Sequence, residues 1–486
     1  MEKKAVVGFI SLGCSKNLCD TEIMLRHLMD AGYEITPEET EADVVIINTC
    51  AFIESAKKES IDNIIDIGWL KKHHTLKGIV VTGCLAERYQ RQILDELPEV
   101  DALVGVGSIH RIVEAVESVL ENAPKENARH PQKKSRSPKG SKANKFCAFD
   151  DKEASVIGGE RVITTGDHMA YLKIAEGCSN RCTYCAIPQI RGKMRSRTMR
   201  DIIEEATSLS AMGIKELNLI AQDTSAYGID LYGKYELPEL IRGICDATDI
   251  PWIRLLYCYP DKITDELIEE IRSNPRVVKY IDIPIQHISD RMLKAMNRHG
   301  DSAMIREKIA KLRTIDGMVL RSTAIVGFPG ETEEDFRELC EFIKEAKFER
   351  FGAFTYSREE DTPAYDFEDQ IDEQEKQNRC DILMQTQLSV SEAYNETRVG
   401  QVIDVMCEGF DPVAESHYGR SYAEAADIDG KIWYSTGRKE LRVAEGEIIK
   451  VKITVAMDYD LVGDAMIEVK EAKSGNLNIS ICQRIP

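Results

Sequence analysis

The stretch Ala170-Tyr-Leu-Lys-Ile174-Ala-Glu-Gly-Cys178-Ser-Asn-Arg-Cys182-Thr-Tyr-Cys185 places a short apolar strand directly before three cysteines. Three thiolates at positions i, i+4 and i+7 of one loop can reach three corners of an iron–sulfur cube, because cysteine normally holds such clusters. The fourth iron then keeps an open position, which is where catalytic metal sites bind their substrates. A structural zinc site is disfavoured, since no second cysteine pair follows at zinc-ribbon spacing.

The same strand opens a series of alternating strands and helices. Amphipathic segments predict helices over 199–212, 301–314 and 331–346, the last opened by the capping-box pattern Thr332-x-x-Asp335. Six β-α units fit a partial or complete (β/α) barrel, whose chemistry lies at the carboxyl ends of its strands. The predicted strands are 170–174, 216–220, 252–257, 280–284, 320–326 and 351–356.

Before this region the chain repeats a simpler pattern: an apolar run, a cysteine and an amphipathic segment. The runs at 5–10, 44–47 and 79–81 lead to Cys14, Cys50 and Cys84 at the spacing of β-α units. Continuous apolar runs predict buried parallel strands, with covering helices over 20–29 and 55–67. Because ligands bind at the carboxyl edge of such sheets, we expect the three cysteines to meet there.

The other segments complete the domain organisation. Residues 122–146 hold eight Lys or Arg against one Glu, which predicts a disordered or loosely ordered tether; a basic arm for RNA is the alternative. Short strands at 401–406, 431–434 and 447–456 predict a small antiparallel β-barrel. We therefore expect an α/β protein with domains at 1–120, 167–397 and 398–470, a basic flexible linker at 121–166 and a tail at 471–486.

Composition narrows the class of protein. Among 486 residues, 63 Lys and Arg face 83 Asp and Glu, a formal net charge of −20, which argues against binding mainly to nucleic-acid phosphates and favours a basic partner. Fourteen cysteines are too few for a disulfide-stapled scaffold. No run approaches the roughly 18 apolar residues that span a bilayer. We expect a cytoplasmic protein with reduced thiols and no membrane partner.

The spacing Cys178-x3-Cys182-x2-Cys185, with an aromatic residue before the last cysteine, resembles the signature of radical S-adenosylmethionine (SAM) enzymes. The resemblance implies a [4Fe–4S] cluster on these cysteines, whose open iron binds SAM. Residues 221–224 resemble that family's contact with the methionyl part of SAM, and 326–331 its glycine-rich turn toward the adenine. The cofactor-binding residues implied are Tyr184, Gln222, Asp223 and Gly327.

Three upstream motifs resemble the methylthiotransferases within that superfamily: Ser11-Leu-Gly-Cys14-Ser-Lys-Asn17, Asn48-Thr-Cys50-Ala-Phe-Ile-Glu-Ser55 and Thr82-Gly-Cys84-Leu-Ala86. The resemblance implies a second [4Fe–4S] cluster on Cys14, Cys50 and Cys84, whose open iron carries the added sulfur. It makes the small barrel a TRAM domain. It also implies SAM as both methyl donor and radical source, and a low-potential electron donor that the sequence does not identify.

The residues within these motifs indicate the expected substrate. The first motif and Ala51–Asp62 resemble the enzymes that modify the β-carbon of an aspartate in ribosomal protein S12. A tRNA adenosine methylthiotransferase is the alternative, and a noncatalytic iron–sulfur protein that binds RNA is the rival from another class. Over 400–470, acids outnumber Lys and Arg by 14 to 8, so we expect the barrel to dock basic S12 rather than tRNA.

Several further residues leave two interpretations open. Cys19 is expected in the core, Cys258 is expected to be buried, and Cys147 is expected to be incidental in the linker. His287 either faces the substrate or makes structural hydrogen bonds. The four cations of Arg191–Arg197 either meet a carboxylate or form a solvated loop. No catalytic residue is assigned from the sequence.

Overall fold

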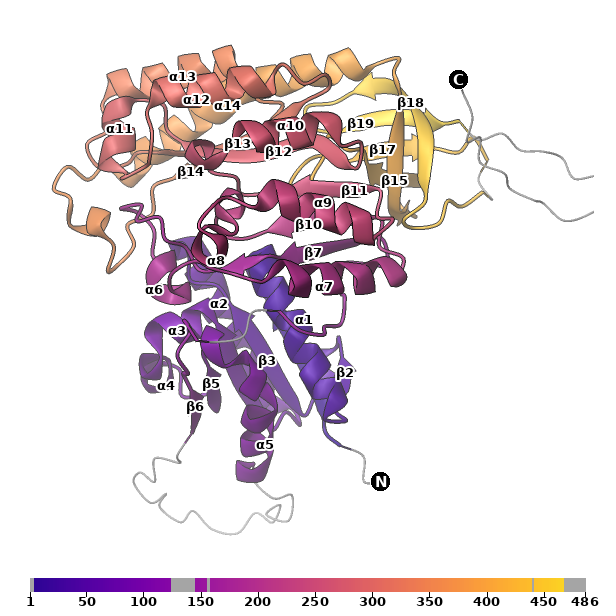
Figure 1. Cartoon of the computed structure of the whole chain (residues 1–486). Coiled ribbons are helices and arrows are strands. Elements are labelled where there is room, and N and C mark those ends of the chain that lie inside the picture. Colours follow the sequence, from indigo (N-terminus) through magenta and orange to yellow (C-terminus); the bar gives the residue numbers. More distant parts are fainter. Residues whose placement is uncertain (1–3, 124–144, 155–157, 439–440, 467–486) are drawn as a thin grey trace, which may run out of the picture.

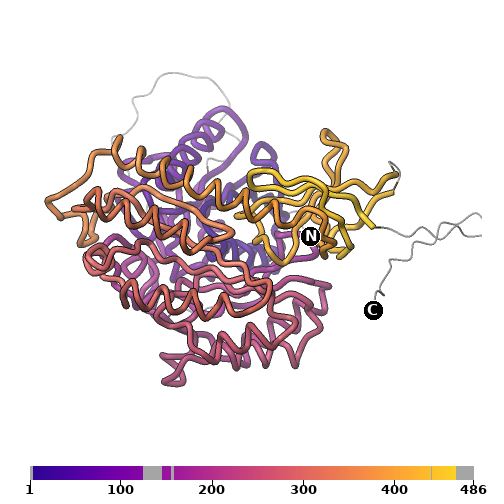
Figure 2. Tube along the Cα trace, turned by 90° about the horizontal axis from the view of Figure 1, so that it is seen from above, coloured from indigo at the N-terminus to yellow at the C-terminus, as the bar shows by residue number. Residues whose placement is uncertain are grey.

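The computed structural model describes residues 4–123, 145–154, 158–438 and 441–466. Three units follow along the chain: a parallel α/β unit, a larger α/β unit and a small β-barrel. In Figure 1 the first unit lies below the central one, and the small barrel lies at its right-hand end. Figure 2, seen from above, also places the barrel at one end of the central unit. No helix in the described ranges is long and apolar enough to cross a membrane.

The first unit is a parallel sheet in the order β2-β1-β3-β4-β5-β6, with the three predicted strands side by side at its centre. Both predicted helices are confirmed as α1 and α2. Apolar side chains fill both faces, against α1 and α5 on one side and against α2, α3 and α4 on the other. The elements are β1 (Val6–Ser11), α1 (Ser15–Asp30), β2 (Glu34–Thr36), β3 (Val44–Thr49), α2 (Glu54–His73), β4 (Gly78–Gly83), α3 (Cys84–Tyr89), α4 (Arg91–Glu96), β5 (Ala102–Val104), α5 (Ile112–Asn122) and β6 (Phe146–Ala148).

The edge strand β6 corrects the predicted linker at 121–166. Phe146–Ala148 pairs with Ala102–Val104 as a sixth parallel strand, and the Lys145 ammonium donates to the Val100 carbonyl at 2.6 Å. Cys147 is therefore a half-buried strand residue rather than part of a tether. The prediction failed because only three residues pair, too few to stand out in a basic stretch. Residues 124–144, the core of the predicted tether, lie outside the described residues.

The central unit is a six-stranded parallel sheet in the order β14-β13-β12-β11-β10-β7. All six predicted strands are confirmed, and the sheet stays open, so the partial form of the (β/α) barrel is correct. The predicted capping box begins α13, because the Thr332 hydroxyl and Asp335 carboxylate bond each other's backbone N–H groups. The strands are β7 (Met169–Lys173), β10 (Glu216–Ile220), β11 (Trp252–Leu255), β12 (Val277–Gln286), β13 (Val319–Val326) and β14 (Arg350–Thr355), with a separate pair β8 (Ala175–Glu176) and β9 (Arg195–Ser196).

Helices cover the outer face of this sheet and bury its apolar side chains. The longest, α14 (Glu373–Arg398), runs along the edge strand β14 and leads into the small barrel (Figure 1). The remaining helices are α6 (Ile187–Arg191), α7 (Met199–Ala211), α8 (Ile229–Tyr232), α9 (Leu237–Ala247), α10 (Asp265–Ser273), α11 (Asp290–Ala295), α12 (Ser302–Leu312) and α13 (Glu333–Ala346).

The C-terminal unit is a closed five-stranded barrel in the order β15-β16-β17-β19-β18. Four neighbouring pairs are antiparallel as predicted, but β17 and β19 are parallel. Two strands were not predicted, because both are short and contain glycine and charged residues. The elements are β15 (Val402–Asp411), β16 (Ser416–Arg420), β17 (Ile432–Ser435), β18 (Ile448–Ala456) and β19 (Leu461–Ala465). The predicted tail lies outside the described residues.

A buried charge cluster fastens this barrel to the central sheet. Arg420 of β16 donates to Glu216 of β10 at 2.6 Å, and Arg254 of β11 donates to the same carboxylate at 2.6 Å. Arg420 also bonds Glu408 of its own barrel at 2.6 Å. Burial disfavours the charged form of Glu216, but the two guanidinium groups outweigh it and lower the pKa of Glu216 from 4.5 to about 2.

This cluster predicts an acid-sensitive attachment of the barrel. Because the folded pKa of Glu216 is depressed, its stabilisation is complete above about pH 4.5 and is lost as the pH falls toward 2. The Glu216→Gln variant should therefore unfold with about 3 kcal/mol less free energy at pH 7, and the difference from wild type should shrink in acid. Urea unfolding at several pH values measures this; a difference that does not depend on pH would contradict it.

Candidate functional site

The first triad, Cys14, Cys50 and Cys84, lies at one edge of the N-terminal sheet. Cys14 follows β1, Cys50 follows β3 directly, and Cys84 opens α3 immediately after β4. These strands are neighbours in the sheet, so the topology brings together cysteines that are 36 and 34 residues apart, as the spacing predicts. Cys50 and Cys84 are buried, whereas Cys14 is exposed, so this site opens to solvent on one side.

Two glycines allow these cysteines to approach. Gly13 and Gly83 have φ of +91° and +88°, a region that other residues rarely adopt. A Cβ on Gly13 would lie 2.9 Å from the Cys50 Cβ, and one on Gly83 would lie 2.2 Å from the Asn48 Oδ1. Glycine is therefore sterically required directly before Cys14 and directly before Cys84.

Surrounding groups set the ionisation of the first triad. Burial raises the pKa of Cys50 to about 12, and the Cys84 and Cys14 thiols add to this shift. At Cys14 the surrounding protein also disfavours the thiolate, but the cations of Lys16 and Arg191 outweigh it and lower the pKa. Cys14 likewise raises the pKa of Cys84, so thiolate charges at this edge of the sheet oppose one another.

The second triad, Cys178, Cys182 and Cys185, occupies the loop between β8 and α6. Its first member follows Gly177, whose φ is +74° and whose Cβ, if present, would lie 2.2 Å from the Lys193 carbonyl oxygen. The loop is compact, since the Cys185 N–H donates to the Cys182 carbonyl at 3.1 Å. Burial raises the pKa of Cys178 to about 11, with Asp223 and Cys182 adding to the shift.

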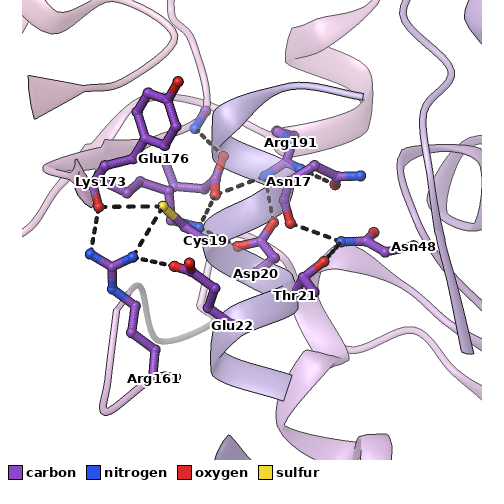
Figure 3. A network of polar contacts seen from close by, with 12 residues as sticks. Asn17, Cys19, Asp20, Thr21, Glu22, Asn48, Arg161, Lys173, Glu176 and Arg191 are labelled. Carbon is purple, nitrogen blue, oxygen red and sulfur yellow. Dashed lines mark hydrogen bonds and ion pairs between the residues drawn. The ribbon is translucent and has the colours of Figure 1, made fainter. Parts of the chain in front are cut away.

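A buried polar network joins the two units (Figure 3). Asp20 of α1 accepts hydrogen bonds from Lys173 of β7 and, at 3.0 Å, from Arg191 of α6. Glu176 of β8 accepts from the same two cations, each at 2.9 Å. Burial disfavours the charged form of Glu176, but Arg191 and Lys173 hold its pKa below the usual value. The four side chains thus form one nearly dry cluster of two acids and two cations.

Arg191 lies nearest to the first triad in this network. Only 2% of it is exposed, and its guanidinium interacts electrostatically with Cys84 and Cys14 while donating to the Asn17 Oδ1 at 3.0 Å. It therefore connects the first triad to Glu176, which follows the first strand of the central sheet. The interpretation of 191–197 as a solvated loop is wrong, because Arg191 and Arg197 are both buried and ion-paired.

The expected cofactor-binding residues lie in different surroundings. Gln222 donates to Glu176 at 2.7 Å, and its buried Oε1 has no hydrogen-bond partner within the described ranges. Asp223 accepts from Asn180 of the cysteine loop at 2.7 Å and from Lys262. Tyr184 packs beside an apolar cluster, with Arg298 and the Cys182 thiol close to its hydroxyl group. Asp223 and Tyr184 therefore lie at the cysteine loop, Gln222 bonds Glu176 just before that loop, and the contact of all three with SAM remains a proposal.

Gly327 has another evident role in the structure. Its φ is +70°, and a Cβ there would lie 2.3 Å from the Lys376 Cγ of α14. Its N–H donates to Glu331 at 2.7 Å. The close approach that requires glycine at this turn is therefore to α14, and a contact with adenine remains a proposal.

His287, Cys19 and Cys258 are structural. The His287 Nδ1 accepts two backbone N–H bonds, from Ile288 and Ser289, and its Nε2 lies 3.1 Å from the Glu331 carboxylate, so both ring nitrogens are satisfied away from the triads. Cys19 and Cys258 are buried as expected.

Two site residues escaped the sequence analysis. Lys262 follows β11 and bonds Asn180 at 2.7 Å, and Arg298 follows α11 and donates to the Cys182 sulfur at 3.8 Å. Lys262 follows a predicted strand end, a signal that could have identified it. Arg298 lies in a loop after a helix, and no local pattern indicates it.

The residues present fit iron–sulfur clusters through their donor chemistry. Each triad offers three reduced thiols, and gathering buried thiolates is unfavourable unless a cationic group offsets their charge. The buried Gln222 Oε1, which has no hydrogen-bond partner within the described ranges, is an acceptor suited to a ligand N–H. In the described ranges no three His, Cys, Asp or Glu side chains are grouped to hold a single metal ion. The fit to clusters therefore rests on the placement and chemistry of the thiols.

Three family models match successive parts of the chain. Residues 6–105 match the Uncharacterized protein family UPF0004, residues 172–343 the Radical SAM superfamily, and residues 399–466 the TRAM domain. An open parallel sheet with three cysteines after its first strand, followed by a TRAM barrel, defines the chain as a radical SAM enzyme. The predicted fold class and superfamily are confirmed.

Curated relatives identify the family more closely. A ribosomal protein uS12 methylthiotransferase RimO from Thermoanaerobacter sp. (strain X514) is 47% identical over 94% of this chain and 99% of its own. The enzyme of the same name from Caldanaerobacter subterraneus subsp. tengcongensis is 48% identical over the same shares. The chain belongs to the family of the ribosomal protein uS12 methylthiotransferases.

A solved structure supports the fold alone. The radical S-adenosylmethionine methyltransferase TsrM from Kitasatospora setae, with cobalamin and a [4Fe-4S] cluster bound, aligns with a TM-score of 0.52 at 16% identity. The alignment covers 74% of each chain.

The buried polar network predicts a large cost for removing its central cation. Arg191→Ala leaves two buried carboxylates with Lys173 alone, so we expect a loss of about 3–5 kcal/mol in the free energy of unfolding. Arg200→Ala is the matched control, because Arg200 pairs with Glu204 at 2.7 Å on the surface, where solvent screens the pair, and its loss should leave stability nearly unchanged. Equal losses in the two variants, measured by urea unfolding, would contradict this assignment.

Proposed function

We propose that this chain attaches a methylthio group to the β-carbon of an aspartate in ribosomal protein S12, using two [4Fe–4S] clusters and SAM. The observation that carries the proposal is that Arg191, which interacts with Cys84 and Cys14 of the first triad, also bonds Glu176, two residues before Cys178 of the second. Replacing an unactivated C–H bond with a C–S bond needs hydrogen abstraction and a sulfur held nearby. Two adjacent sites suit this chemistry, because holding both reaction partners in place lowers its entropic cost.

We assign Cys178, Cys182 and Cys185 to the cluster that binds SAM, and Cys14, Cys50 and Cys84 to the cluster that carries sulfur. The cluster held by the second triad would supply the electron that cleaves SAM to an organic radical, and the cluster held by the first triad would supply the sulfur. A second SAM supplies the methyl group. The electron must come from a low-potential donor.

The side chains around the second triad hold and orient these groups. The Lys262 ammonium and the Asn180 amide both donate to Asp223, which fixes the carboxylate beside the cysteine loop. Glu176 is fixed in the same way and accepts from Gln222, which leaves the Gln222 Oε1 directed to a ligand. Asn180, Asp223 and Glu176 are buried, and such burial helps to exclude water from the reaction. The aromatic ring of Tyr184 forms one side of the proposed cofactor site.

The relatives' names support S12 as the substrate. The charge argument for docking on the barrel is weaker than the sequence suggests, because three of the barrel's acids are already paired. Glu424 and Asp429 bond Arg350 and Tyr280 of the central unit, and Glu408 bonds Arg420 of the barrel itself, so none of the three is free to attract a basic partner. The net charge of −20 still disfavours tRNA.

The two-cluster assignment predicts separable losses. Replacing the second triad by alanine should remove half of the bound iron and abolish formation of 5′-deoxyadenosine from SAM. Replacing the first triad should also remove half of the iron, yet leave reductive SAM cleavage and stop methylthiolation. Iron analysis and chromatography of anaerobically reconstituted protein measure both. If the first-triad variant keeps all of its iron, that triad holds no cluster.

The substrate is tested by competition. Reconstituted wild-type enzyme, reductant and SAM are offered S12 and tRNA together, and mass spectrometry locates the methylthio group. We expect it on an S12 aspartate. Modification of tRNA would favour the adenosine enzyme, and clusters without SAM cleavage would favour a noncatalytic RNA-binding protein.

A further inference from the structure

Helix α2 presents an apolar row to solvent, although its opposite face packs into the core. Ile61, Ile65 and Trp69 recur every four residues, so they share one side of the helix. Their exposed fractions are 36%, 50% and 57%, and Phe52 just before the helix is 42% exposed. Scattered exposed side chains are ordinary, but a continuous row that contains tryptophan is typical of a binding surface.

Acidic side chains flank this row. Asp62 and Asp66 follow the isoleucines on the adjacent side of the helix, and both are exposed. Over the exposed positions of α2, acids outnumber lysines: Glu54, Glu59, Asp62 and Asp66 against Lys58 and Lys72. An apolar row with an acidic border is complementary to a partner that offers apolar anchors among basic residues.

The helix that carries the row begins close to the first triad in the chain. Phe52 follows Cys50 by two residues, and α2 starts two residues after Phe52. The start of the helix is held against the central unit, since the Glu54 N–H donates to Ser357 at 3.2 Å and Lys57 pairs with Glu359 at 3.1 Å. From Glu54 to Trp69 the helix extends about 22 Å. A small protein lying on this face therefore has part of its surface at the triad.

We propose that the exposed face of α2, defined by Ile61, Asp62, Ile65, Asp66 and Trp69, docks the basic protein substrate. This inference rests on the proposed function, because it names where S12 binds. Proteins that bind ribosomal RNA phosphates are rich in Lys and Arg, which is the chemistry that the acidic border attracts. The apolar row supplies the contact area, and the acids supply orientation and association rate.

The apolar row is tested with Ile65→Glu and Trp69→Ala in the full-length reconstituted enzyme. We expect KM for S12 to rise about tenfold, with kcat, iron content and SAM cleavage without S12 unchanged. Ile382→Glu is the matched control, because Ile382 is also an isoleucine on a helix, α14, and is 53% exposed. It should leave KM unchanged. Direct binding of S12, measured by calorimetry, should weaken by the same factor as KM rises.

The acidic border is tested with the double variant Asp62→Lys/Asp66→Lys, against Glu392→Lys on α14 as control. We expect a higher KM for S12 and a weaker dependence of KM on salt, because screening acts on the attraction that the variant removes. Equal KM values in wild type and all α2 variants would overturn the inference.

The remaining outcomes separate this inference from the proposed function. If wild type modifies S12 and the α2 variants do so with unchanged KM, only the docking surface is wrong. If wild type cleaves SAM but never modifies S12, the proposed function fails first. If sedimentation shows that wild type dimerises while the α2 variants are monomers with unchanged KM, the face joins two copies of the chain, and the docking inference is overturned.

Discussion

Two carboxylates and two cations that almost no water reaches hold the first unit against the central one. Removing water from Asp20, Glu176, Lys173 and Arg191 is costly, and each is stable there only while the others neutralise it. The cluster therefore tolerates one relative position of the two sheets. Because Arg191 also lies beside Cys84 and Cys14, that position sets the spacing between the triads. Glycines with positive φ before Cys14, Cys84 and Cys178 complete the arrangement on each side.

The structural features that could be predicted from the sequence were those that depend on local patterns of residues. Apolar runs ending at a cysteine located both triads, because strand order in a parallel sheet brings consecutive strand ends to one edge. The capping box at Thr332 located the start of α13. Pairings across long sequence distances were not predictable: β6 needed β5, and Arg420 needed Glu216, 204 residues away. Arg298 reaches the cysteine loop from a segment that has no sequence signal.

Charges counted from the sequence gave wrong expectations for two segments, because burial decides whether a charged side chain can attract a partner. The barrel segment is acidic by count, yet Glu424 and Asp429 bond a guanidinium and a hydroxyl group of the central unit, and Glu408 bonds Arg420 within the barrel. The four cations after the cysteine loop gave the opposite error, because two of them are buried structural charges. A formal charge describes an attractive surface only after the inward-facing groups are removed from the sum.

The docking of the barrel has a consequence for dividing this protein. Glu216 belongs to β10, inside the central sheet, and one of its two guanidinium partners comes from the barrel. A fragment ending at α14 would open a dry ion cluster to water at the amino-terminal end of the sheet, opposite the cysteines. The TRAM unit thus closes the amino-terminal end of the radical SAM sheet and is not an interchangeable module. The two units are best treated as one folding unit.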